Sequence, residues 1–100
     1  MPLEIKEYHG VFEVLGDVTA QNVGALRAYF DSVLESQEQV IVSLEKVTVL
    51  DASAAHFFEK LYRESAERNK VMALIGRQND TVLETLTATK TNYILSPDRI

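Results

Sequence analysis

The chain has 100 residues, of which 46% are hydrophobic and 25% are charged, and these values predict a single globular domain over residues 1–100. Ten Lys and Arg against 15 Asp and Glu give a net charge of −5, and the basic residues are scattered, so nucleic-acid binding and attachment to anionic lipid are disfavoured. The chain contains no Cys and no apolar run near the ~20 residues of a membrane helix, so we expect a cytoplasmic protein without disulfides and without membrane insertion.

The first third of the chain predicts a hairpin followed by a helix. Residues 3–6 alternate between apolar and charged, residues 11–15 form a second apolar strand, and His9 and Gly10 between them indicate a turn. From Asn22 onward the apolar residues recur at helical spacing, which predicts a helix with one buried stripe. That stripe consists of Val23, Leu26, Phe30, Val33 and Leu34.

Two apolar runs, residues 40–44 and 47–50, end abruptly at Asp51. Small residues follow and then a helical pattern, so the segment predicts a buried strand that leads directly into a helix. A helix start has unpaired N–H donors and the positive end of the dipole, which suit a carboxylate or a phosphate. We expect this helix to pack on the sheet through Phe58, Leu61 and Tyr62.

The last third of the chain begins with another continuous apolar run, residues 71–75, as expected of a central strand. A helix follows, and its start has several candidate caps. Thr81 and Glu84 fit a capping box, while Asn79 and Asp80 are competing caps. The core-facing residues of this helix are predicted to be Val82, Leu83 and Leu86.

Residues 92–95 predict a short strand that closes the sheet before Pro97. Strands that alternate with helices of these lengths indicate an α/β fold. We therefore expect a mixed, mostly parallel sheet of four or five strands with an N-terminal hairpin and about three helices packed on it.

The junction at Asp51 resembles the signature of the STAS domain, the fold of bacterial anti-sigma factor antagonists. In that family a strand runs into Asp-Ser-Ser/Thr-Gly before a helix, and a partner kinase phosphorylates the first Ser. Here Ala52 occupies the phosphoacceptor position, Ser53 is the second hydroxyl position and Ala54 replaces the Gly. The chain thus resembles the domain but lacks its switch residue.

The likeness extends over most of the chain. Residues 16–20 resemble the family's turn from the second strand into the first helix, although Thr19 stands where an acidic residue is common. Residues 71–76 resemble the next core strand. The order and spacing of these segments, together with the Asp51 junction, carry the resemblance.

The resemblance implies a non-catalytic protein–protein interaction module whose partner is an anti-sigma factor with serine kinase activity. In the family, phosphorylation abolishes binding, since a phosphate brings about −1.5 to −2 charges into the interface. Ala52 cannot carry a phosphate, so a constitutive binder is expected. The alternative is a cytoplasmic STAS subunit of a membrane transport assembly, such as a lipid-trafficking ABC transporter, which also needs no phosphoserine.

The predicted partner contact lies at the helix start and on its first turns. For Asp51 and Ser53 the simpler interpretation is a helix cap, and for Phe57 it is the edge of the core. Ser53 is also the remaining candidate for phosphorylation, although its side chain points about 100° away from that of residue 52. The predicted contact residues are Asp51, Ala52, Ser53, Ala54, Phe57 and Lys60.

An enzyme is not expected. Asp51, Ser53 and His56 lie within one turn, but side chains that radiate from one helix start point apart and cannot form a triad. With two His, no Cys and no clustered carboxylates, the sequence predicts no catalytic residue, no metal site and no cofactor.

Overall fold

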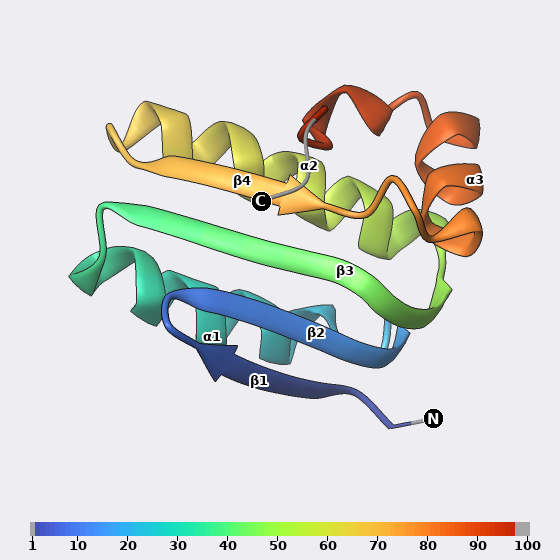
Figure 1. Cartoon of the computed structure of the whole chain (residues 1–100), viewed down its shortest axis with the longest axis horizontal. Helices are drawn as coiled ribbons and strands as arrows, with labels where there is room; N and C mark the ends of the chain where they lie inside the picture. The colour runs from blue at the N-terminus through green and yellow to red at the C-terminus, as the bar shows by residue number, and fades with distance from the viewer. Residues whose placement is uncertain (1, 98–100) are drawn as a thin grey trace.

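The computed structural model describes residues 2–97, in which a hairpin is followed by alternating helices and strands (Figure 1). The strands are β1 (Glu4–Tyr8), β2 (Val11–Val18), β3 (Gln39–Leu50) and β4 (Val71–Ile75). The helices are α1 (Val23–Ser36), α2 (Ala52–Glu67) and α3 (Asp80–Ala88), and a short 3-10 helix, η1, spans Asn92–Ile94.

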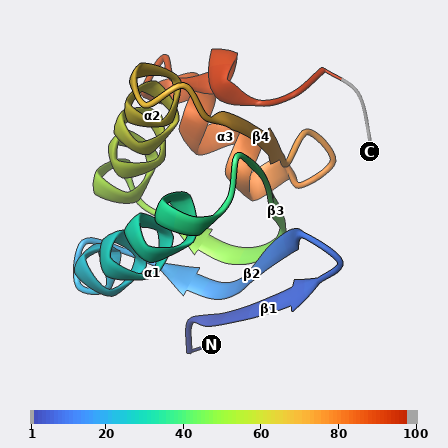
Figure 2. The same ribbon diagram turned by 90° about the vertical axis from the view of Figure 1, so that its left-hand side faces the viewer.

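The four strands form one sheet in the order β1-β2-β3-β4. β1 pairs antiparallel with β2, and the other two pairs are parallel. Figure 2 shows that the three α-helices cover the same face of this sheet, so the opposite face has no helix over it among the described residues. The predicted α/β fold with its N-terminal hairpin is confirmed.

The hairpin turn consists of His9 and Gly10, whose φ angles are 53° and 86°. Two consecutive positive φ angles are typical of the two-residue turns whose twist matches that of the flanking strands. Tyr8 and Val11 consequently face each other at the end of the ladder. The turn is the one that the sequence predicted.

β3 joins the two predicted apolar runs into one strand of 12 residues. Its register with β2 shifts twice, between Glu13 and Leu15 and again between Gly16 and Asp17. At each shift β3 has one residue more than β2, as in a β-bulge. Gly16, with φ 90°, supplies the backbone conformation that this irregular stretch needs. As a result β2 continues to Val18, three residues beyond the predicted strand.

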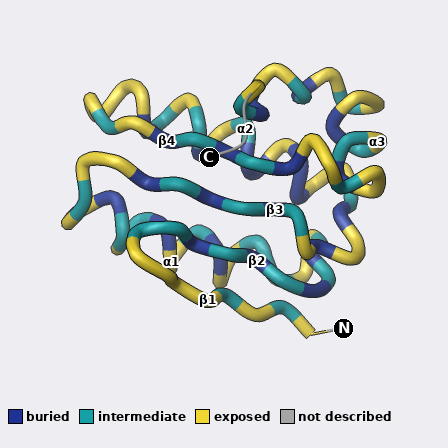
Figure 3. Tube along the Cα trace, in the orientation of Figure 1, coloured by how far each residue is buried: buried dark blue, intermediate teal, exposed yellow. Residues whose placement is uncertain are grey.

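The hydrophobic core lies between the sheet and its three helices, and Figure 3 shows that the central strands hold buried positions while β1 is mostly exposed. Phe58 and Leu61 of α2 are fully buried, and Tyr62 packs partly buried at the edge. In α3, Val82 and Leu86 are buried and Leu83 is partly buried. The packing residues predicted for α2 and for α3 are therefore correct.

The predicted strand over residues 92–95 is wrong. Asn92–Ile94 form η1, and only Leu95 makes a parallel bridge to Leu74. Ile94 and Leu95 are both buried, whereas successive residues of a strand point to opposite faces. Burial of two adjacent side chains against the end of α3 and the edge of β4 favours a turn over a strand.

Candidate functional site

The site that the sequence predicted lies where β3 ends and α2 begins. The carboxylate of Asp51 accepts hydrogen bonds from two backbone N–H groups with its two oxygens. Oδ1 accepts from Ala54 N at 2.9 Å, which caps α2, and Oδ2 accepts from Ala20 N at 2.9 Å. Asp51 N in turn donates to Val18 O. Asp51 thus joins the start of α2 to the loop after β2.

The loop between β2 and α1 is itself organised by Asn22. The side-chain oxygen of Asn22 accepts from Thr19 N, and its amide donates to Asp17 O at 2.8 Å. Asn22 precedes the first residue of α1 but makes no side-chain cap there, because its polar atoms are engaged in the loop. The loop is therefore held on both sides, by Asn22 from within and by Asp51 from α2.

Asp17 and Thr48 extend these contacts to the last residues of the two strands. The hydroxyl of Thr48 donates to Asp17 Oδ1 at 2.5 Å, and this bond lowers the pKa of the Asp17 carboxyl from its ordinary value. On the other side, Thr85 of α3 donates to Leu50 O at 2.9 Å. Three elements, β2, β3 and α3, thereby fix the position of Asp51.

Small exposed side chains surround the Asp51 carboxylate. Ala20 of the loop and Ala52 and Ser53 of α2 are exposed, and Lys60, two turns along α2, is exposed as well. Ala54 is fully buried. We call Ala20, Ala52, Ser53 and Lys60 the α2 corner. A hydroxyl added at position 52 would be accessible to solvent, because Ala52 itself is.

Phe57 lies beneath this surface and not on it. Only 8% of its area is exposed, and its ring packs edge-on against Phe58. The guanidinium of Arg27 in α1 lies 5.4 Å from the ring centroid and forms an ion pair with Glu64 at 2.6 Å, which raises the pKa of Arg27. Phe57 was interpreted either as a partner contact or as the edge of the core, and its burial agrees with the edge of the core. The side chain that lies over its ring is Arg27.

Asp51 and His56 do not contact each other as members of a catalytic triad would. Both oxygens of Asp51 are used by backbone N–H groups, and His56 Nδ1 lies 3.8 Å from Glu59 Oε1. Within residues 2–97 no group of three His, Asp or Glu side chains could hold a metal ion. No described helix is long and apolar enough to cross a membrane.

A second helix start, that of α3, is built around Asn79. Its Oδ1 accepts from Thr81 N and Val82 N, so of the competing caps that the sequence offered Asn79 is the one used, and Thr81 does not form the capping box. The two N–H groups of the Asn79 amide are shared among three carbonyl oxygens of β3, which lie 2.8–3.0 Å from the nitrogen. Those carbonyls lie beside the first bulge of β3, where the ladder to β2 is interrupted. They belong to Leu44, Glu45 and Val47.

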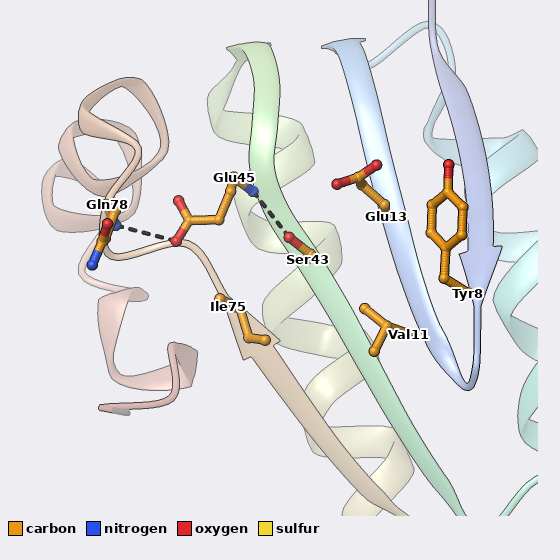
Figure 4. A pocket seen from close by; sticks show the side chains of 7 residues that line it. All are labelled: Tyr8, Val11, Glu13, Ser43, Glu45, Ile75 and Gln78. Atoms are coloured by element: carbon orange, nitrogen blue, oxygen red, sulfur yellow. Dashed lines mark hydrogen bonds between the residues drawn. The ribbon is translucent and has the colours of Figure 1, made fainter. Parts of the chain in front are cut away.

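A shallow hollow of about 630 Å³ lies on the helix-free face of the sheet (Figure 4). Its floor is apolar, from Val11 and Ile75, and Glu13 and Glu45 supply two carboxylates. Glu13 pairs with Lys46 at 3.5 Å, and Glu45 accepts a long bond from Gln78 N at 3.4 Å. Both carboxylates therefore have partners within the fold.

Sequence reasoning missed the contact between Asp51 and the β2–α1 loop. Asp51 and Ala20 are separated by 31 positions, and no local pattern indicates which backbone groups a carboxylate will meet at such a distance. It also missed Arg27, whose position over Phe57 depends on how α1 crosses α2. Only the register between β2 and β3 could have indicated that the β2–α1 loop and the start of α2 lie side by side.

Comparison with known proteins gives a consistent result. No curated protein matches the chain in sequence. Among solved structures, the anti-sigma factor antagonist SpoIIAA in its unphosphorylated form superposes with a TM-score of 0.74 at 14% identity, over 95% of this chain and 86% of that one. An anti-sigma factor antagonist from Mycobacterium paratuberculosis gives a TM-score of 0.72 at 15% identity, over 97% and 86% of the two chains.

At these identities the two structures establish a common fold, which is the one described above. The family model is more specific, since the model of the STAS domain matches residues 1–97. That match spans nearly the whole chain and includes both the β2–α1 loop and the α2 corner. The chain belongs to the STAS domain family.

Proposed function

We propose that this protein is a non-catalytic interaction module that binds a protein partner through the α2 corner. The observation that carries the proposal is the double hydrogen bond of Asp51. One carboxylate holds two surface segments, the β2–α1 loop and the first turn of α2, in a fixed relation. A surface held in this way binds without the entropic cost of ordering two loops.

The composition of the corner suits docking. Ala52 and Ser53 are small, so a partner can approach the backbone at the start of α2 closely. Lys60 adds an exposed positive charge on α2 to a chain whose net charge is −5, whereas the charge of Arg27 is paired with Glu64. An acidic segment of the partner would therefore find its complement here and repulsion over much of the remaining surface.

The partner that we propose is an anti-sigma factor or serine kinase, because two solved structures with this fold are anti-sigma factor antagonists. Binding would be constitutive, because Ala52 has no hydroxyl to phosphorylate. The proposed contact set keeps Asp51, Ala52, Ser53, Ala54, Phe57 and Lys60, with Asp51, Ala54 and Phe57 acting from beneath the surface. We place the protein in the cytoplasm, where such partners act.

The test is capture of partners from the native cell with three versions of the protein. Lys60→Glu changes the corner, and Lys46→Glu is the control, because it makes the same charge change on the helix-free side of the sheet; since it also places a carboxylate beside Glu13, both variants are first shown to be folded by circular dichroism. We expect the wild type and Lys46→Glu to retain the same protein and Lys60→Glu to lose it. Equal capture by all three would remove the interface from α2.

Mass spectrometry of the captured protein also decides which partner class is correct. A serine kinase or anti-sigma factor supports the proposal. A permease together with an ATPase would instead indicate the transporter subunit, since that assembly uses the same domain without phosphoserine. Truncation of Phe57 is not a clean interface test, because a ring that is 8% exposed contributes to the fold.

A further inference from the structure

The two edges of the sheet differ in how they are closed. At the β4 edge, Ser96 N donates to Leu74 O at 2.7 Å and Leu95 bridges the same residue. At the other edge, β1 is the terminal strand, and no further strand of residues 2–97 pairs with it. Four of its five residues are exposed. An open strand edge offers unpaired N–H and C=O groups to another strand.

The hairpin fixes which backbone groups of β1 are free. Tyr8 and Val11 flank a two-residue turn, so they exchange hydrogen bonds with each other. In an antiparallel ladder this arrangement alternates along the strand, so Glu4 and Lys6 also face β2 with their backbone groups. The N–H and C=O groups of the intervening residues point away from the sheet. Those residues are Leu3, Ile5 and Glu7.

We propose that two copies of this chain pair antiparallel through β1, about a two-fold axis at Ile5, so that two four-stranded sheets become one continuous sheet. In this register Ile5 faces Ile5 of the second copy, and Leu3 faces Glu7. Each of these pairs joins outward-pointing backbone groups and exchanges two hydrogen bonds. Glu4 faces Lys6 of the second copy, and the symmetry produces this ion pair twice.

Charge selects this register over its neighbours. Outward groups must meet outward groups, so the axis passes through a residue of β1 and not between two. An axis at Glu4, at Lys6 or at Glu7 brings two like charges face to face, which is destabilising. An axis at Ile5 avoids like charges and also aligns the opposite charges of Glu4 and Lys6, an ion pair that an axis at Tyr8, the other uncharged residue of β1, does not form.

The helix side of β1 has room for the second copy. A hollow of about 300 Å³ lies between β1 and α1, and Tyr29 at its rim is 37% exposed. A two-fold axis perpendicular to the sheet places α1 of both copies on the same face, with their hollows adjacent. The apolar side chains at the centre of the pairing would then fill this space. The lining of the hollow consists of Leu3, Glu4, Ile5, Ala25, Leu26 and Tyr29.

Sedimentation velocity at protein concentrations up to about 1 mM, the range of weak protein association, tests the proposal. We expect a monomer–dimer equilibrium for the wild type. Glu4→Lys and Lys6→Glu each place like charges opposite each other twice, and we expect each to raise the dissociation constant about tenfold. The double variant restores opposite charges and should regain the wild-type constant.

An equimolar mixture of Glu4→Lys and Lys6→Glu provides the second arm. In the mixed pair every Lys faces a Glu, so we expect the heterodimer to form with about the wild-type constant, from two chains that each dimerise about tenfold more weakly alone. Amide hydrogen exchange locates the contact, since the N–H of Ile5 should slow with concentration while that of Lys6, bonded to β2, should not. A wild type that stays monomeric throughout, or single variants that dimerise as well as the wild type, would overturn the proposal.

Discussion

Two helices of this domain begin at a capping side chain, α2 at Asp51 and α3 at Asn79, and the two caps are built differently. Asp51 accepts twice, from Ala54 N and from Ala20 N. Asn79 accepts at its helix start, and its two N–H groups are shared among three carbonyl oxygens of β3. An amide can donate and accept, whereas a carboxylate can only accept, so each residue matches the backbone groups around it.

This difference indicates that Asp51 supports an exposed surface, whereas Asn79 supports the interior of the domain. The donors and acceptors of Asn79 are consumed by the bulge of β3, and its contacts serve the interior of the domain. The contacts of Asp51 join two segments whose outer side chains, Ala20, Ala52 and Ser53, are exposed. We therefore expect changes at Asn79 to affect stability most, and changes at the α2 corner to affect binding most.

The largest effects are expected for substitutions of Asn79, and the first of these is Asn79→Ala. The substitution removes a helix cap and leaves the carbonyls of the β3 bulge without their donor, and together these losses should lower the free energy of unfolding by about 2–4 kcal/mol. Asn79→Asp keeps the cap oxygen but turns a negative charge toward the carbonyls, so it should be at least as damaging. Urea unfolding followed by circular dichroism measures both.

A smaller loss is expected for Asp51→Ala, about 1–2 kcal/mol, because the two backbone N–H groups that it releases lie near solvent. Asp51→Asn should cost less than Asp51→Ala, as one oxygen still accepts. The same unfolding experiment gives the comparison. If Asp51→Ala proved more destabilising than Asn79→Ala, the conclusion that Asn79 contributes more than Asp51 to the stability of the domain would be wrong.

Asp51→Ala should weaken partner binding by a free energy similar to the stability that it loses. Without Oδ2 the β2–α1 loop is no longer held to α2, and the α2 corner loses its fixed geometry. We expect partner affinity to fall by about tenfold at a temperature where the variant remains folded. Asn79→Ala, measured below its own unfolding transition, should leave that affinity nearly unchanged and is the control.

The smallest effect on stability is expected for Ala52→Ser, within about 0.5 kcal/mol, because position 52 is exposed. This variant should nevertheless become a substrate of a partner serine kinase, whereas the wild type should not. Ser53 is one position further along the helix, about 100° away, where the kinase would hold the phosphate donor poorly. Intact-mass measurement after incubation with ATP decides, and a phosphate on wild-type Ser53 would contradict constitutive binding.

The sequence determined the fold class and the strand-to-helix junction at Asp51 because both depend on local patterns. Alternation in residues 3–6, the continuous apolar runs and the helical stripes are properties of short segments, and hydrophobic burial enforces them. Asp51 was identified as a helix start for the same reason. The strand over residues 92–95 failed because a short apolar segment fits a strand and a turn equally well until its surroundings are known.

The tertiary structure decided which groups the two capping side chains meet. Nothing near Asp51 in the sequence indicates Ala20, and nothing near Asn79 indicates the carbonyls of β3. Both contacts depend on the register between β2 and β3, including the two bulges, which arises from the packing of whole strands. A helix cap is encoded within four residues. The second contact of each capping side chain is made with a chain segment about 30 positions away, and folding alone brings these segments together.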